Sequence, residues 1–120
     1  MGRMSRSKGA RGERELAAKF EEIFGCKARR GRQFCGSPDS PDIQTTLPGV
    51  HPECKHVERF NLYDAMEQAT ADAGNKIPIV CHRRNKKEWI LCMKLKDAPK
   101  FAQLISDFMN RKETGDENEI

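Results

Sequence analysis

The segment from Ser40 to Val57 constrains the fold of this chain more than any other, because its pattern fits two short strands joined by one tight turn. Pro48-Gly49 divides the segment, and this dipeptide suits the centre of a type II turn, where glycine tolerates the positive φ that the turn requires. A strand-like run flanks the dipeptide on each side. We therefore expect a β-hairpin over residues 40–57.

The register of this hairpin decides which side chains share a face. The pairs expected for a two-residue loop are Thr46 with His51, Gln44 with Glu53, and Asp42 with Lys55. Paired side chains point to the same side and alternate with period 2, so Asp42, Glu53 and Lys55 would lie together. Pro-Gly is not among the favoured two-residue hairpin turns. A register shifted by one residue would instead place Asp42 beside Cys54, which would contradict a shared face for Asp42, Glu53 and Lys55.

Two carboxylates and an ammonium on one face suit a particular chemistry. Charged groups are costly to bury unless they are paired. Carboxylate oxygens are the ligands that Mg²⁺ takes up, and the ion lowers the pKa of a bound water. Asp42 and Glu53 would be the ligands, the Cys54 carbonyl could add a third oxygen, and Lys55 could orient the water. The plainer alternative is a surface hairpin with an Asp42–Lys55 ion pair across the strands.

The remaining periodicity predicts a mixed α/β fold. We expect helices over 8–24, 61–73 and 98–109, a strand over 27–34, and two further strands over 77–81 and 89–93 joined by a polar turn. The expected order is α-β-β-β-α-β-β-α, a mixed β-sheet flanked by helices. In the first helix, Glu13 falls within the arc of apolar positions that should face inward. An acid there either interacts with the helix dipole or completes an acidic site with Asp42 and Glu53.

The length of the chain and the spacing of its cysteines restrict the classes of protein to which it can belong. A chain of 120 residues forms one domain, here expected over residues 1–112 with a mobile basic N-terminus and a disordered acidic tail over 113–120. No run approaches the roughly 18 apolar residues of a membrane span, which predicts a cytoplasmic protein with no membrane partner. The five cysteines include no C-x-x-C pair, so we expect reduced thiols.

Positive charge is unevenly spread along the chain. Residues 1–110 contain 20 Lys and Arg against 14 Asp and Glu, whereas residues 111–120 contain 2 against 4. Separated basic clusters on a small domain favour a polyanionic partner such as nucleic acid. The residues expected to contact phosphates are Lys8, Arg11, Arg14, Arg29, Arg30 and Arg32. Such contacts give affinity without sequence preference.

A different metal site could use His51, Cys54 and His56 as zinc ligands. Cys54 and His56 need not share a face of the strand, His51 points with Glu53, and no fourth ligand lies at a usual spacing. Asp39, which also follows a Ser-Pro pair, is the alternative to Asp42 as a ligand.

Several motifs together resemble the PD-(D/E)XK nuclease superfamily, and most closely the archaeal-type Holliday-junction resolvases. The matching segments are 8–16 (KGARGEREL), 28–30 (ARR), 41–43 (PDI), 53–55 (ECK) and 77–80 (IPIV). The resemblance covers about residues 8–95. It departs at Cys54, where an aliphatic residue is common, and at Pro52, which precedes the motif.

The resemblance implies a restriction-endonuclease-like fold and a metal-dependent endodeoxyribonuclease. In such enzymes the residues matching Glu13, Asp42 and Glu53 serve the metal site, and the lysine matching Lys55 serves the attacking water. The family implies Mg²⁺, with Mn²⁺ as a substitute, and a homodimer that nicks two strands of a four-way DNA junction in recombination. The alternatives are a less selective nuclease on branched, flapped or linear DNA, and a non-catalytic nucleic-acid-binding protein with the same fold.

Overall fold

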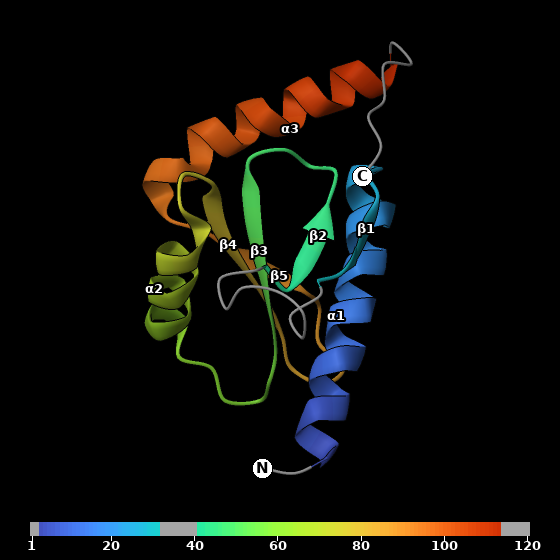
Figure 1. Ribbon diagram of the computed structural model, residues 1–120, viewed down its shortest axis with the longest axis vertical. Helices are drawn as coiled ribbons and strands as arrows, with labels where there is room; N and C mark the ends of the chain where they lie inside the picture. The colour runs from blue at the N-terminus through green and yellow to red at the C-terminus, as the bar shows by residue number, and fades with distance from the viewer. Residues whose placement is uncertain (1–2, 32–40, 114–120) are drawn as a thin grey trace.

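The computed structural model describes residues 3–31 and 41–113, with side chains described over 9–31 and 41–111. The elements in chain order are α1 (Arg3–Phe24), β1 (Ala28–Arg30), β2 (Ile43–Thr45), β3 (Val50–His56), α2 (Leu62–Ala73), β4 (Ile77–Arg83), β5 (Ile90–Cys92), the short 3₁₀-helix η1 (Leu95–Asp97) and α3 (Ala98–Glu113). Apart from η1, this is the predicted order of helices and strands (Figure 1).

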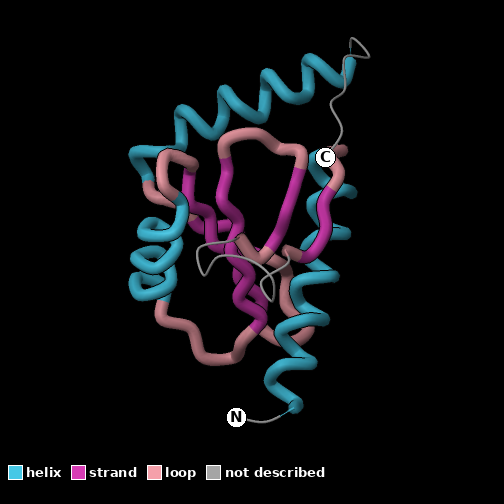
Figure 2. Tube along the Cα trace, viewed as in Figure 1, coloured by secondary structure: helices cyan, strands magenta, loops and turns pink. Residues whose placement is uncertain are grey.

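The strands form one three-stranded and one two-stranded sheet. β3 pairs with β4 in parallel, and β4 pairs with β5 in antiparallel orientation. β1 and β2 pair with each other in antiparallel orientation. The larger sheet is therefore mixed, and the helices flank the strands, which confirms the predicted fold class (Figure 2).

Because side chains alternate along a strand, neighbouring residues of β4 pack in two separate hydrophobic cores. Ile79 packs in a cluster with Leu16 and Phe20 of α1, whereas Val80 packs against Ala69 of α2. Successive residues of a strand point to opposite faces, so α1 and α2 cover opposite sides of the sheet. Helix α3 packs across one end of the strands, where Phe108 joins the α1 core (Figure 1).

The predicted hairpin register is wrong. Strand β2 forms its ladder with β1, so Gln44 lies opposite Arg29 and not opposite Glu53. Between this segment and β3, the described main-chain bond is from Asp42 N–H to the Pro52 carbonyl, at 3.1 Å. Asp42 therefore lies close to Cys54, as in the shifted register.

Pro52 explains why β2 does not form a ladder with β3. The Ile77 N–H donates to the Gly49 carbonyl at 2.8 Å, so the main-chain groups of odd-numbered residues in β3 face β4. Those of Pro52 and Cys54 face β2. Proline has no N–H to donate at that edge, which therefore cannot support a regular ladder.

Several element boundaries differ from expectation. Helix α1 begins at Arg3, before the expected start at residue 8, and α3 continues to Glu113, the first residue of the predicted tail. Strand β1 ends at Arg30, and the rest of the strand expected over 27–34 lies mostly outside the described residues. The remainder of the tail, 114–120, also lies outside them. None of the described helices combines the length and apolar character needed to span a membrane.

Candidate active site

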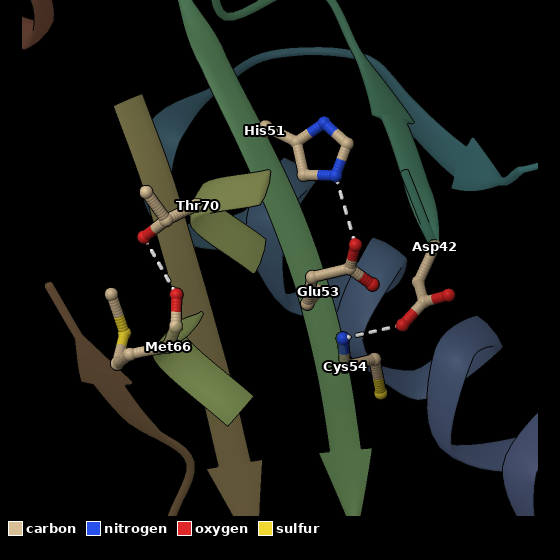
Figure 3. A network of polar contacts seen from close by, with 6 residues as sticks. All are labelled: Asp42, His51, Glu53, Cys54, Met66 and Thr70. Carbon is tan, nitrogen blue, oxygen red and sulfur yellow. Dashed lines mark hydrogen bonds and ion pairs between the residues drawn. The ribbon is translucent and has the colours of Figure 1, made fainter. Parts of the chain in front are cut away.

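Asp42 is held firmly at the junction between the two sheets. Its N–H donates to the Pro52 carbonyl, and its own carbonyl accepts from the Gly31 N–H at 2.8 Å. Its side-chain Oδ2 accepts from the Cys54 N–H at 2.9 Å, which places the carboxylate against the edge of β3 (Figure 3). The next residue, Ile43, is fully buried and anchors the start of β2 in the core.

Glu53 points from β3 toward the same place. Figure 3 shows its carboxyl group between the imidazole of His51 and the carboxyl group of Asp42. The His51 Nε2 is hydrogen-bonded to Glu53 Oε1 at 2.8 Å, and the Glu53 side chain is only 13% exposed. The absence of a ladder between β2 and β3 has not separated the two acids, because Asp42 reaches β3 through its side chain.

Glu13 approaches from α1. Its Oε1 accepts from Arg30 Nε at 2.7 Å, and the Glu13 side chain is 14% exposed. Gly12 allows this close approach, because a Cβ on it would lie 2.6 Å from the Cβ of His56 in β3. A larger residue at position 12 would push the helix, and with it Glu13, away from the strand.

The charges of the three acids influence one another. Burial is the main cause that raises the pKa of Glu53, to about 7, and the neighbouring Asp42 raises it further while His51 opposes the shift. Burial also raises the pKa of Glu13, where Arg30 opposes and Asp42 adds to the shift. Asp42 thus interacts electrostatically with both of the other acids, Glu13 on α1 and Glu53 on β3.

Lys55 and Cys54 lie on opposite faces of β3. Alternation along the strand puts Lys55 on the same side as His51 and Glu53, as predicted from the sequence. The Cys54 side chain packs against the α1 core, and burial raises the pKa of its thiol. Its carbonyl shares the β2-facing edge with its N–H, so it opens toward Asp42.

Comparison with solved structures identifies the fold. The structure is similar to that of Hjc, a Holliday junction resolvase from the archaeal hyperthermophile Archaeoglobus fulgidus, with a TM-score of 0.54. The match covers 69% of this chain and 73% of that chain, at 24% sequence identity. The chain has the fold of that structure. No protein-family model matches the sequence, and no curated protein matches it.

The resolvase fold brings carboxylates together in a way that suits a hard cation. Within residues 9–31 and 41–111, no three His, Cys, Asp or Glu side chains form a ready-made metal cage. Asp42 and Glu53 nevertheless converge, and Mg²⁺ commonly binds through one or two carboxylates while keeping several waters. The two carboxylates therefore fit Mg²⁺, and the charge of Asp42 also acts on Glu13 of α1.

The alternative zinc site is not assembled on this fold. His51 projects from the face of β3 opposite to Cys54 and His56, and its Nε2 is bonded to Glu53. Three ligands on two faces of one strand cannot share one ion. Asp39, the alternative to Asp42, lies outside the described residues.

The predicted phosphate-binding residues differ in their exposure and in their partners. Arg11, Arg14 and Arg29 are exposed, and Arg29 Nε donates to Gln44 at 3.1 Å. Arg30 is half-exposed but pairs with Glu13, so it belongs to the acidic site as much as to the surface. The side chain of Lys8 and the whole of Arg32 lie outside the described part of the chain.

Sequence reasoning missed two residues that shape this site. Glycine destabilises the interior of a helix and is useful there where another segment approaches closely. The position of Gly12 directly before Glu13 was therefore a signal of close packing at this site. His51 was considered only as a zinc ligand and as a residue pointing with Glu53. Its spacing of two from Glu53 within a strand could have suggested that the two side chains bond to each other.

Proposed function

We propose that this protein is a metal-dependent endodeoxyribonuclease that hydrolyses phosphodiester bonds in branched DNA, with the four-way junction as its substrate. The observation that carries the proposal is the convergence of the Asp42 and Glu53 carboxyl groups at the edge of β3. Glu13 on α1 is linked to them through the charge of Asp42. A protein that only binds a polyanion gains nothing from clustered acids.

Each residue has a distinct role in the proposed reaction. Asp42 and Glu53 hold the metal, the Cys54 carbonyl offers a further oxygen, and Glu13 completes the acidic cluster. Mg²⁺, or Mn²⁺ in its place, would supply charge neutralisation and a more acidic bound water. Lys55, two residues beyond Glu53 on the same face, orients the attacking water and offsets the charge that develops on the phosphate.

DNA binding is assigned to the exposed arginines beside this cluster. Arg11 and Arg14 on α1 and Arg29 on β1 present guanidinium groups to solvent. Contacts with phosphates position a nucleic acid by its shape and carry no base information. This suits an enzyme that recognises a branched backbone, and the resolvase fold favours a four-way junction.

A fluorescent four-way junction incubated with Mg²⁺ tests the proposal. The wild-type protein should introduce paired nicks, whereas Asp42→Asn and Lys55→Ala should abolish them and leave junction binding within about threefold, because neither residue is assigned to DNA affinity. Glu22→Gln is the matched control, since Glu22 lies on α1 but is exposed and pairs with Lys19. Undiminished cleavage by both variants would refute the assigned site.

The same assay separates the competing functions. Equal cleavage of junction, flapped and linear DNA at matched salt would favour a less selective nuclease. Tight, salt-dependent binding without cleavage in Mg²⁺ or Mn²⁺ would favour a non-catalytic binding protein.

We further propose a homodimer, which would let one protein nick two strands symmetrically. A groove of about 720 Å³ lies between α2 and η1, and exposed Tyr63 and Leu95 stand on its two walls. The α2 wall is acidic at Glu67 and the opposite wall is basic at Lys94. A two-fold axis could place the acidic wall of one copy against the basic wall of the other, which is the self-complementarity that a symmetric interface needs.

A further inference from the structure

His51 is the most deeply buried ionisable group near the acidic cluster. Its side chain is only 3% exposed, and its Nε2 is hydrogen-bonded to Glu53 Oε1 at 2.8 Å. The two residues lie two apart on β3 and so share a face of the strand. In Figure 3 the imidazole lies on one side of the Glu53 carboxyl group and Asp42 lies on the other.

The Glu53 side chain needs an anchor to stay in this position. A glutamate has three side-chain torsions, and fixing them costs conformational entropy. Asp42 is both hydrogen-bonded to Glu53 and repels its charge, so the pair alone does not favour two ionised carboxylates side by side. The hydrogen bond with His51 opposes both effects. His51 lies on β3, and the pairing of β3 with β4 fixes the backbone from which the imidazole projects.

We propose that His51 is a positioning residue that holds the Glu53 carboxylate toward Asp42 and thereby prepares these two acids to share one divalent cation. The inference rests on the metal site of the proposed function. His51 is not itself a ligand in this arrangement, because its Nε2 is engaged with Glu53 Oε1. Hydrogen bonds that orient a ligating carboxylate influence metal affinity as strongly as many direct ligands.

Two substitutions separate the hydrogen bond from simple packing. His51→Leu keeps an apolar volume but removes the donor, whereas His51→Gln places an amide N–H close to the position of Nε2. Titration with Mn²⁺, followed by the electron paramagnetic resonance signal of the free ion, measures affinity without any DNA or cleavage. We expect His51→Leu to weaken Mn²⁺ binding about ten- to a hundredfold, and His51→Gln to restore it to within about threefold of wild type.

A histidine on the neighbouring strand provides the matched control. His82 lies on the same face of the sheet, but its Nε2 is bonded to the Val57 carbonyl and not to a carboxylate. His82→Leu should therefore leave Mn²⁺ affinity unchanged. Thermal unfolding of all three variants establishes that affinity is compared between folded proteins.

Nuclear magnetic resonance of the metal-free protein tests the hydrogen bond itself. Long-range ¹H–¹⁵N spectra should find the His51 proton on Nε2, with a ¹⁵N shift that changes in Glu53→Gln. A proton on Nδ1 alone would overturn the inference even if His51→Leu failed to fold.

The failure of this inference can be distinguished from the failure of the proposed function. A wild-type protein that binds no Mn²⁺ would overturn both. Equal Mn²⁺ affinity of wild type and folded His51→Leu would overturn the positioning role alone. Loss of affinity in His51→Gln as large as in His51→Leu would also overturn it, because the donor would then not be what matters.

Discussion

The Asp42 carboxylate accepts a hydrogen bond from the main chain of β3, but its charge disfavours the ionised forms of two neighbouring glutamates. Its carboxylate caps the Cys54 N–H at the edge of β3, a position where Pro52 prevents a regular ladder. The same carboxylate raises the pKa of both Glu13 and Glu53. Active sites commonly keep such repulsion at the expense of stability.

Removing this charge should therefore stabilise the metal-free protein. Asn at position 42 can still accept from the Cys54 N–H through its amide oxygen, but it no longer repels the two glutamates. We expect Asp42→Asn to raise the free energy of unfolding by about 1 kcal/mol without metal. Urea denaturation measures the change, and added Mg²⁺ should stabilise wild type more than the variant. A variant less stable than wild type would mean that repulsion is not the dominant effect of this carboxylate.

At the scale of single residues, the sequence indicated which side chains are candidates for the site, but it predicted few of the contacts that these side chains make. Asp42, Glu53 and Lys55 could be selected because their spacing suits a strand pair and a cation. The bond from Arg30 to Glu13 could not be predicted, since it depends on how α1 lies against β1. The bond from His51 to Glu53 needed only strand alternation, and was within reach of the sequence.

Among the elements, α1 and β3 approach each other closely at one point. Gly12 of α1 meets the side chain of His56, with no room for a Cβ. Gly9, one turn earlier, has nothing within 4 Å of the place where its Cβ would be. The two glycines therefore offer a direct comparison of packing with helix propensity.

The two alanine substitutions should have opposite effects. Gly9→Ala should stabilise the protein by about 1 kcal/mol through helix propensity. Gly12→Ala should destabilise it by roughly 1–3 kcal/mol because of the contact with His56. Chemical denaturation of the two variants measures both changes. If Gly12→Ala were as stabilising as Gly9→Ala, the close packing of α1 on β3 would be refuted.

The order of the elements followed from periodicity, but the pairing of β2 did not. Turn geometry suggested that β2 would pair with the strand next in sequence. Instead β2 pairs with β1, and Thr46 N–H extends that ladder by donating to the Lys27 carbonyl. Pro52 has no N–H to donate to a ladder with β2, and this missing donor is the physical reason why the prediction failed.

At the scale of the whole molecule, positive charge surrounds an acidic centre. Arg11 and Arg14 on α1 and Arg29 on β1 are exposed, while Glu13 and Glu53 are largely buried. This distribution suits a protein that attracts a polyanion with its surface and holds a cation within. The charge balance was visible in the sequence, although the division between surface and site was not.

The salt dependence of junction binding should report the arginine contacts. Each phosphate contact adds about 0.9 to the slope of log affinity against log salt concentration on duplex DNA. We expect the double variant Arg11→Ala, Arg29→Ala to lower that slope by about 2. Fluorescence anisotropy over a range of salt concentrations measures the slope. Lys100→Ala, a change to an exposed cation of α3, should not alter it.

The proposed dimer surface can be tested separately from DNA binding. Leu95 is 89% exposed on η1, and a charge at this position would oppose its burial by a second copy. We expect Leu95→Glu to weaken self-association by at least about tenfold, since an interface carboxylate would lose hydration without gaining a partner. Sedimentation velocity at micromolar concentration measures the change, with Ile23→Glu on α1 as a control at another exposed apolar residue. A monomeric wild-type protein would refute the dimer.

The close approach of residue 31 to residue 41 has one more consequence. The Gly31 N–H is bonded to the Asp42 carbonyl, and a Cβ on Gly31 would collide with the carbonyl oxygen of Pro41. The described parts of the chain on either side of residues 32–40 are thus tied together at the entrance of β2. The place of Asp42 beside β3 therefore depends on a residue without a Cβ at position 31.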